Sequence, residues 1–162
     1  MGTSESGSNR GDEKETVRRL LRAAFTTPGR GERADGTLDR HLYESLRADL
    51  SLLRAEDLQR ELPRLLETLL DIPPEERTGG KDLNMVILHL DVLPWYDRQR
   101  HIESSRRTLE QYELFTSEQA EAVYRWLLYV RDWPAFEYLQ DHVERALQYW
   151  HQRSRGSPPT EA

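Results

Sequence analysis

Cysteine is absent from the 162-residue chain, and this absence excludes several kinds of site. Without a thiol there is no disulfide, no thiolate nucleophile and no cysteine-based zinc site. The absence fits a reducing compartment, and we expect the protein to be cytoplasmic. No apolar run follows the first methionine, so the sequence predicts no signal peptide. No stretch approaches 18 apolar residues, so it also predicts no membrane association through a spanning helix.

Lysine is almost missing, since only two of the 23 basic side chains are lysine and the other 21 are arginine. The 29 acidic side chains give a net charge of −6 at pH 7. A negative chain repels nucleic-acid phosphates unless a local basic patch reverses the field. The arginines are scattered and often stand beside acidic residues, as on a solvated helix surface. The charge balance therefore disfavours nucleic acid as a partner.

One basic cluster leaves a weaker nucleic-acid or anion-binding hypothesis open. It lies within residues 95–107 and combines four arginines with aromatic and histidine side chains, which are Arg98, Arg100, Arg106, Arg107, Trp95, Tyr96 and His101. Acidic neighbours dilute its charge, which favours a solvated loop over a binding site.

β-Branched apolar residues are scarce, because valine and isoleucine together occur nine times and leucine 24 times. Leucine is a good helix former, whereas β-branched residues favour strands. No long stretch alternates apolar and polar residues. The sequence predicts an all-α fold, an irregular bundle of five or six helices with disordered termini.

Polar, glycine-rich segments divide the chain. We expect disordered tails at residues 1–12 and 153–162, and one helical domain over residues 38–152. Residues 13–37 form an N-terminal helix followed by a flexible linker. The helix, at 13–25, has one apolar face made by Val17, Leu20, Leu21 and Ala24. Because the linker is rich in glycine, we expect this helix to be a loosely attached arm.

Between the linker and residue 115 the sequence predicts four more helices. We expect helices over about 38–49, from near Ala55, and after an N-cap at Asp82, with another within 102–113. Proline removes a backbone donor and clashes with the preceding turn. Pro63 therefore predicts a kink or a fresh start in the helix that begins near Ala55.

The most aromatic part of the chain is FTSEQAEAVYRWLLYVRDW, residues 115–133. Thr116 and Gln119 match a capping box with Phe115 as a hydrophobic staple, so the helix should start at Ser117. More than half of its circumference is apolar. Two interpretations are open. The helix is central in the domain, or one flank is exposed as a partner-binding surface, made by Trp126, Tyr129 and Trp133.

The last helix, about 135–151, carries a flank that is both aromatic and polar. Its candidate ligand-binding residues are spaced by four, three and four positions, and they are Tyr138, His142, Arg145 and Tyr149. The alternative is an ordinary core boundary, and we favour that alternative.

Three stretches together have a familiar pattern, LQRELPRLLETLLD, LFTSEQAEAVYRWLLYV and ALQYW. They resemble a family of small uncharacterised bacterial all-helical proteins, one of the domain-of-unknown-function groups. The resemblance covers roughly residues 40–151. It implies a bacterial, helical, single-domain protein, and it brings no activity, cofactor or catalytic residue.

Catalytic motifs and metal-ligand spacings are also missing. The five histidines form no HExxH pair, and no GxSxG elbow or P-loop occurs. His41 and Glu44 are spaced to share a metal, but an exposed capping pair explains them better. We predict no catalytic residue, no metal and no cofactor.

These patterns favour a non-catalytic bacterial protein-interaction module. A concrete version is an immunity or adaptor protein that covers a basic partner, because an acidic helical protein is steered toward positive surfaces. The alternative is a small-ligand binder or enzyme that uses the flank of the last helix.

Overall fold

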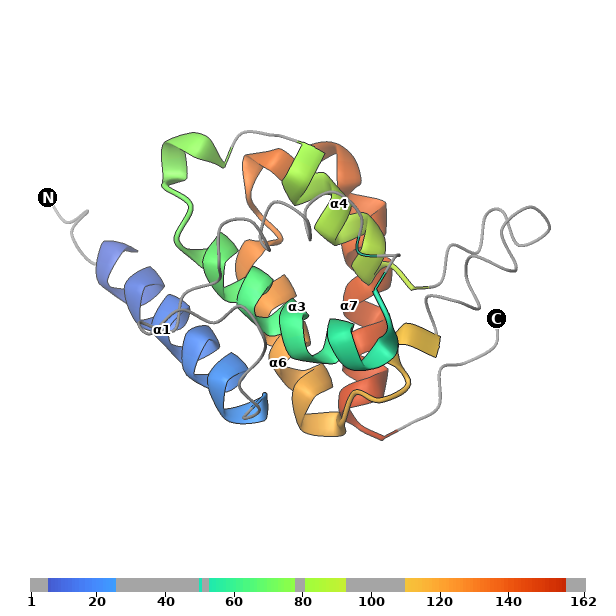
Figure 1. The fold of residues 1–162 in the computed structure, drawn as a ribbon. Helices are drawn as coiled ribbons and strands as arrows, with labels where there is room; N and C mark the ends of the chain where they lie inside the picture. Colours follow the sequence, from blue (N-terminus) through green and yellow to red (C-terminus); the bar gives the residue numbers. More distant parts are fainter. Residues whose placement is uncertain (1–5, 26–49, 51–52, 78–80, 93–109, 157–162) are drawn as a thin grey trace, which may run out of the picture.

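The described part of the chain is helical. The computed structural model describes residues 6–25, 50, 53–77, 81–92 and 110–156, and these ranges contain no strand. The predicted all-α fold is confirmed. No helix in these ranges is long and apolar enough to cross a membrane. In chain order, the elements shown in Figure 1 are α1 (Ser6–Ala24), α3 (Ala55–Leu70), η2 (Pro74–Glu76), α4 (Lys81–Leu90), α6 (Ser117–Val130), η4 (Pro134–Leu139) and α7 (Gln140–Ser154).

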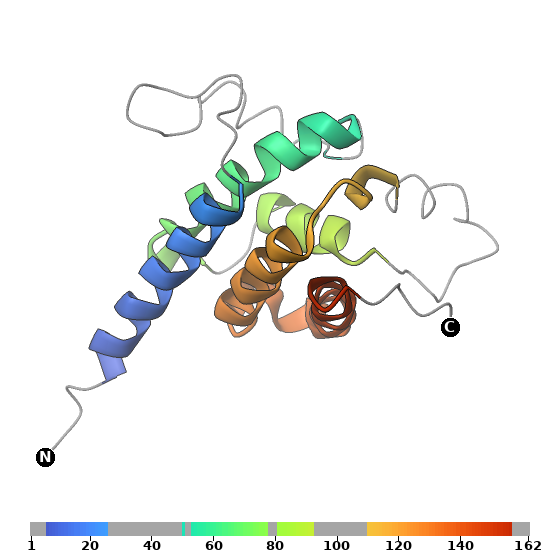
Figure 2. The same ribbon diagram turned by 90° about the horizontal axis from the view of Figure 1, so that it is seen from below.

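Helix α6 lies at the centre of the domain. It packs against both α1 and α7, and Figure 2 shows it between them. On a third side it reaches α3, because the indole Nε1–H of Trp126 donates a hydrogen bond to the carbonyl of Leu66 at 2.9 Å. A helix covered on three sides needs apolar residues around most of its circumference. The central-helix interpretation of residues 117–130 is therefore confirmed.

The hydrophobic core is shared by α1, α3, α4, α6 and α7. Helix α3 contributes an almost unbroken set of buried residues, made up of Leu58, Leu62, Pro63, Leu65, Leu66, Leu69 and Leu70. From the other side, Trp150 of α7 is fully buried and donates its Nε1–H to the carbonyl of Leu90 at 3.1 Å. The two buried indoles thus find backbone acceptors, as buried tryptophans require.

The expected loose arm is instead part of the core. In α1, Val17 and Leu21 are buried against the rest of the domain. Arg18 and Arg22 add ion pairs to α3, since Arg18 Nη2 lies 2.6 Å from Asp71 Oδ1 and Arg22 Nε lies 2.7 Å from Glu67 Oε1. The expectation was wrong because linker composition says nothing about whether the apolar face beyond it packs.

Several predicted boundaries also need correction. The restart at Pro63 is wrong, because α3 runs through it in one piece. Buried leucines on both sides of Pro63 hold the helix together despite the missing donor. Asp82 is the second residue of α4 and not its cap. Helix α1 begins at Ser6, inside the predicted tail, and α7 ends at Ser154.

The aromatic helix and the last helix are separated by an element that the periodicity did not predict. Helix α6 ends at Val130, and residues 134–139 form the 3₁₀ helix η4 before α7 begins at Gln140. Proline fits the first turn of such a helix because its missing N–H has no partner there anyway. The predicted helix over residues 38–49 and the linker at 26–37 lie outside the described residues.

Candidate functional site

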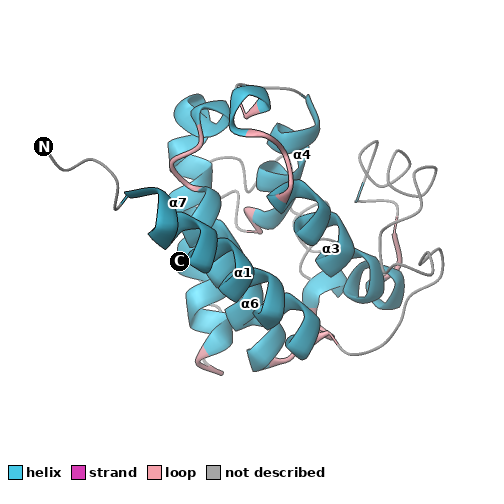
Figure 3. Cartoon of the chain, turned by 90° about the vertical axis from the view of Figure 1, so that its left-hand side faces the viewer, coloured by secondary structure: helices cyan, strands magenta, loops and turns pink. Residues whose placement is uncertain are grey.

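Helices α1 and α6 lie side by side and run in opposite directions. Figure 3 looks onto the side of the domain that α1 occupies and shows α1 in front of α6. At one end, Gln119 Nε2 near the start of α6 donates a hydrogen bond to the carbonyl of Ala24 at the end of α1, at 3.2 Å. At the other end, Asn9 and Arg131 line the same hollow. The two helices therefore form an antiparallel pair.

The N-terminus of α6 is fixed by the predicted capping box. Thr116 Oγ1 accepts the N–H of Gln119 at 3.1 Å, and Gln119 Oε1 accepts the N–H of Thr116 at 3.1 Å. The same Oε1 accepts a hydrogen bond from Gln59 Nε2 of α3 at 2.8 Å. With its bond to α1, Gln119 ties three helices together at one point. The capping box is confirmed, and Phe115 beside it is buried.

Two hollows follow the seam between α1 and α6, with volumes of about 440 Å³ and 400 Å³. Both include Leu20, so they follow one another along the two helices and together are called the groove, and the second hollow also touches Ser154 of α7. The apolar side chains that line the groove are Val17, Leu20, Ala23, Ala24, Leu128 and Tyr129. A concave, mostly apolar surface of this size is typical of binding sites.

The charges along the groove are unevenly matched. In the middle, Arg125 Nε lies 2.9 Å from Glu121 Oε1, so this pair is neutral. Toward the ends stand Asp12, Glu13 and Glu118, which are exposed and form no ion pair among the described residues. Arg131 lies near the Asp12 end. Its charge is offset there by the Asp132 carboxylate, which lies 3.9 Å from Arg131 Nε. The groove thus has an apolar floor, a neutral middle and acidic ends.

The predicted partner surface of three aromatic residues is wrong for two of them. Trp126 is fully buried, and Trp133 is 7% exposed with its ring stacked on Phe136 at a centroid distance of 6.2 Å. The Arg77 guanidinium covers the Trp133 ring at 4.2 Å. Trp126 belongs to the core because α6 is covered on three sides, whereas Trp133 lies beyond the end of α6, at the start of η4. Only Tyr129 reaches a solvent-filled space, and that space is the groove.

Two of the four candidate ligand-binding residues on α7 meet at a buried carboxylate. His142 Nδ1 lies 2.7 Å from Asp91 Oδ2, and Arg145 Nη2 lies 2.9 Å from the same oxygen. The Asp91 side chain is 2% exposed, at the end of α4. His142 and Arg145 also contact each other, with 3.0 Å between Nδ1 and Nη2. This Asp91 cluster joins α4 to α7 and uses its charges internally.

The two tyrosines of that predicted flank lie elsewhere. Tyr138 is 93% exposed on η4, whereas Tyr149 is buried edge-on against Trp150 at a centroid distance of 5.2 Å. Burial raises the pKa of the Tyr149 phenol, and nearby Arg153 partly opposes the rise. The four side chains do not converge, because the predicted helix includes η4, which displaces Tyr138 from the geometry of a single helix. The prediction of one four-residue site is wrong.

A second buried network was missed by the sequence analysis. The phenol of Tyr112 is fully buried and lies in hydrogen-bond contact with His89 Nδ1 of α4. His89 Nε2 lies 3.3 Å from Gln111 Oε1, and Gln111 Nε2 donates to the carbonyl of Leu53 at 2.6 Å. Burial raises the pKa of Tyr112 well above its usual range. No local motif reveals this network, because its partners are 22 to 58 residues apart.

Within the described ranges, no group of three or more histidine or acidic side chains is placed to hold a metal ion. The His41–Glu44 pair and the basic cluster at residues 95–107 lie outside those ranges. The hypotheses attached to them stay predictions.

Comparison with known proteins gives no relative on which to base a function. No family model, curated protein or solved structure matches the chain. The resemblance to a family of small bacterial all-helical proteins therefore stays a prediction, and functional inference depends on the geometry alone.

Proposed function

We propose that the chain is a non-catalytic protein-interaction module that receives a helical segment of a partner in the groove between α1 and α6. The observation that carries this proposal is that two hollows, which share Leu20 and are lined by apolar side chains, follow one another along the seam. Helix-in-groove recognition uses this type of surface, with the apolar face of the guest helix against the floor.

The net charge of −6 supports a basic partner. An acidic surface accelerates encounter with positive proteins and repels acidic ones. An immunity or adaptor protein that covers a basic partner in a bacterial cytoplasm is the concrete form of the proposal.

The alternative, a ligand binder or enzyme at the α7 flank, has less support. The Asp91 carboxylate already engages His142 Nδ1 and Arg145 Nε and Nη2, which leaves fewer of their polar atoms for a ligand. Catalytic groups also need a reacting molecule within hydrogen-bond reach in a cleft. We therefore infer that the Asp91 cluster stabilises the fold.

The proposal is tested by filling the groove. Ala23 is exposed and lines the groove, so Ala23→Trp should leave α1 folded and obstruct a guest helix. The probe is a labelled amphipathic peptide of about 18 residues, long enough to form a helix, with a leucine stripe and a glutamine polar face. Fluorescence anisotropy should show binding to the native chain and at least about tenfold weaker binding to Ala23→Trp, as expected when roughly 1.4 kcal/mol is lost.

The matched control is Gln148→Trp, which adds the same indole to an exposed position of α7 that does not line the groove. Its affinity should equal that of the native chain. Absence of peptide binding to the native chain, or equal loss in both variants, would contradict the proposal.

A further inference from the structure

We infer that the guest helix carries lysine or arginine at both ends of an apolar stripe of about three turns, with no charge required in the middle. This inference rests on the proposed function, because it describes the partner of the same groove. It specifies where the positive charges of the partner lie, which net charge alone does not.

The length of the stripe follows from α1. The groove extends at least from Asp12 to Ala23, which are eleven positions apart. At 1.5 Å per residue this is about 16 Å, or about three helical turns. On a guest helix, residues eleven positions apart lie on the same face, because eleven steps of about 100° return almost to the starting direction. Two basic residues at that spacing can face both ends of the groove together.

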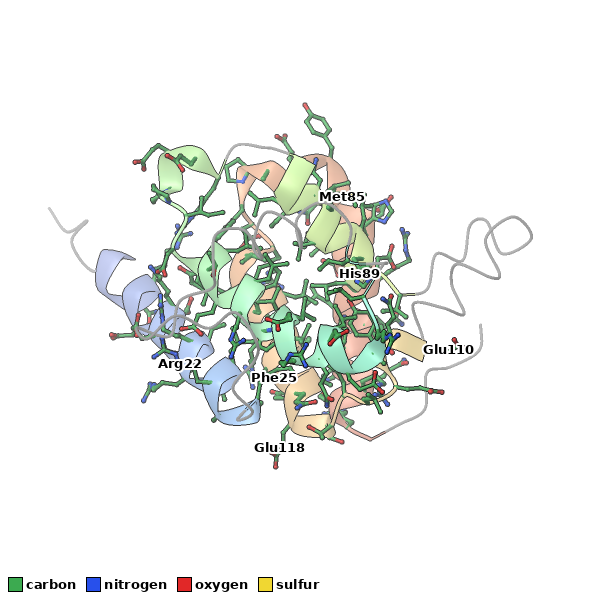
Figure 4. The ribbon with its side chains drawn as sticks, in the orientation of Figure 1. Arg22, Phe25, Met85, His89, Glu110 and Glu118 are labelled. Atoms are coloured by element: carbon green, nitrogen blue, oxygen red, sulfur yellow. The ribbon has the colours of Figure 1, made fainter. Side chains whose placement is uncertain are left out.

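The positions of the charges follow from acids that form no ion pair within the part of the chain that the structure describes. Asp12 and Glu13 stand at one end and Glu118 at the other, all three exposed. Figure 4 shows Glu118 projecting away from the body of the domain at its end of α6. An exposed acid at a groove rim can meet a basic side chain without the large desolvation cost of a buried ion pair.

The guest helix needs no charged residue opposite the middle of the groove. The Glu121 and Arg125 side chains neutralise each other there at 2.9 Å. A basic residue placed opposite this pair would meet Arg125 as well as Glu121, so attraction and repulsion would largely cancel. The apolar side chains of Leu20 and Leu128 beside the pair favour leucine-like residues at the centre of the guest.

The inference is tested with three peptides built on the leucine-stripe probe and matched in length and helix content. The first has lysines at both ends of the stripe, the second has glutamates at those positions, and the third has the same lysines moved to the middle. In low salt, we expect the end-lysine peptide to bind roughly tenfold more tightly than the end-glutamate peptide, because two exposed ion pairs replace two repulsions. Its advantage should shrink in high salt.

Charge reversal on the protein completes the test. Asp12→Lys and Glu118→Lys should each weaken binding of the end-lysine peptide by about three- to fivefold, and each should strengthen binding of the end-glutamate peptide. Glu144→Lys, an equal charge change at an exposed α7 position outside the groove, should do neither.

The outcomes separate this inference from the proposed function. Equal or tighter binding of the middle-lysine or end-glutamate peptide would overturn the end-charge arrangement and leave the groove as a helix-binding site. Failure of all three peptides and of the glutamine probe to bind would overturn the proposed function and this inference together.

Discussion

The α1–α6 seam and the α4–α7 seam differ in the environment of their acidic residues. Between α4 and α7, Asp91 is enclosed and shared by His142 and Arg145, so the charges are used up in joining two helices. Between α1 and α6, Asp12 and Glu118 stay exposed around an apolar hollow and form no ion pair among the described residues. The comparison separates acids that are already matched inside the domain from acids that stay exposed, and we propose that only the exposed acids are available to a partner.

Deleting α1 should have the largest effect, because it removes one wall of the groove and opens the core. Burying side chains such as Val17 and Leu21 contributes about 1.5–3 kcal/mol each, against a total stability of about 5–15 kcal/mol for a typical domain. We expect a chain lacking residues 1–25 to lose its cooperative thermal transition, measured by circular dichroism. An unchanged thermal transition would instead support the earlier expectation that α1 is a loosely attached arm.

Removing the buried acid should have the next largest effect. Asp91→Ala leaves His142 and Arg145 without their shared carboxylate, and breaking a buried ion pair costs about 3–5 kcal/mol. Because both partners are partly exposed, we expect a smaller loss of about 2–3 kcal/mol in urea unfolding. Peptide binding to the groove should not change. A full-stability Asp91→Ala variant would contradict the structural role.

His142→Ala should cost less, about 1–2 kcal/mol, because Arg145 still pairs with Asp91. Thermal unfolding measures this loss. If the alternative function at this flank holds, His142→Ala will instead keep its melting temperature and lose affinity for a small molecule or anion. The ratio of the two effects thus distinguishes a fold-stabilising cluster from a ligand site.

The smallest effect concerns the ion pair between α1 and α3. A hydrogen bond from Arg18 lowers the pKa of Asp71, and Lys14 lowers it further. A lowered folded-state pKa adds stability above the unfolded pKa, and this stability is lost as the pH falls through the folded pKa. Because Asp71 is 54% exposed, we expect Arg18→Gln to cost under about 1 kcal/mol at neutral pH and nearly nothing below the folded pKa.

Carboxyl-carbon NMR titration provides the direct check on that pair. The pKa of Asp71 should move up toward its ordinary value in Arg18→Gln. An unchanged pKa of Asp71 in Arg18→Gln would show that Arg18 is not the main cause of the lowered pKa.

Local signals in the sequence predicted the fold better than the site. The Thr116–Gln119 capping box and the apolar circumference of residues 117–130 are properties of one helix, so they could be recognised without its neighbours. The fresh start predicted at Pro63 is wrong, because the effect of the proline depends on the buried leucines around it. The loose-arm prediction failed for the same reason, since only packing shows where the face of Val17 and Leu21 goes.

The sites were harder because they join distant segments. Asp91 meets its partners 51 and 54 residues further along the chain, and no helical spacing predicts such a contact. The groove is made by α1 and α6, and Leu20 and Leu128 are more than 100 residues apart. Tyr129 is half-buried and lines the groove, whose other wall is α1, a helix that the sequence analysis placed apart from the domain.

We propose that the seam between α1 and α6 is the docking surface, and backbone amide NMR of the full chain tests this proposal most directly. Addition of the end-lysine peptide should shift the amide signals of Leu20, Ala23, Glu121 and Leu128, and leave those of Asp91 and His142 in place. Shifts confined to the α4–α7 seam, or no shifts at saturating peptide, would contradict the account.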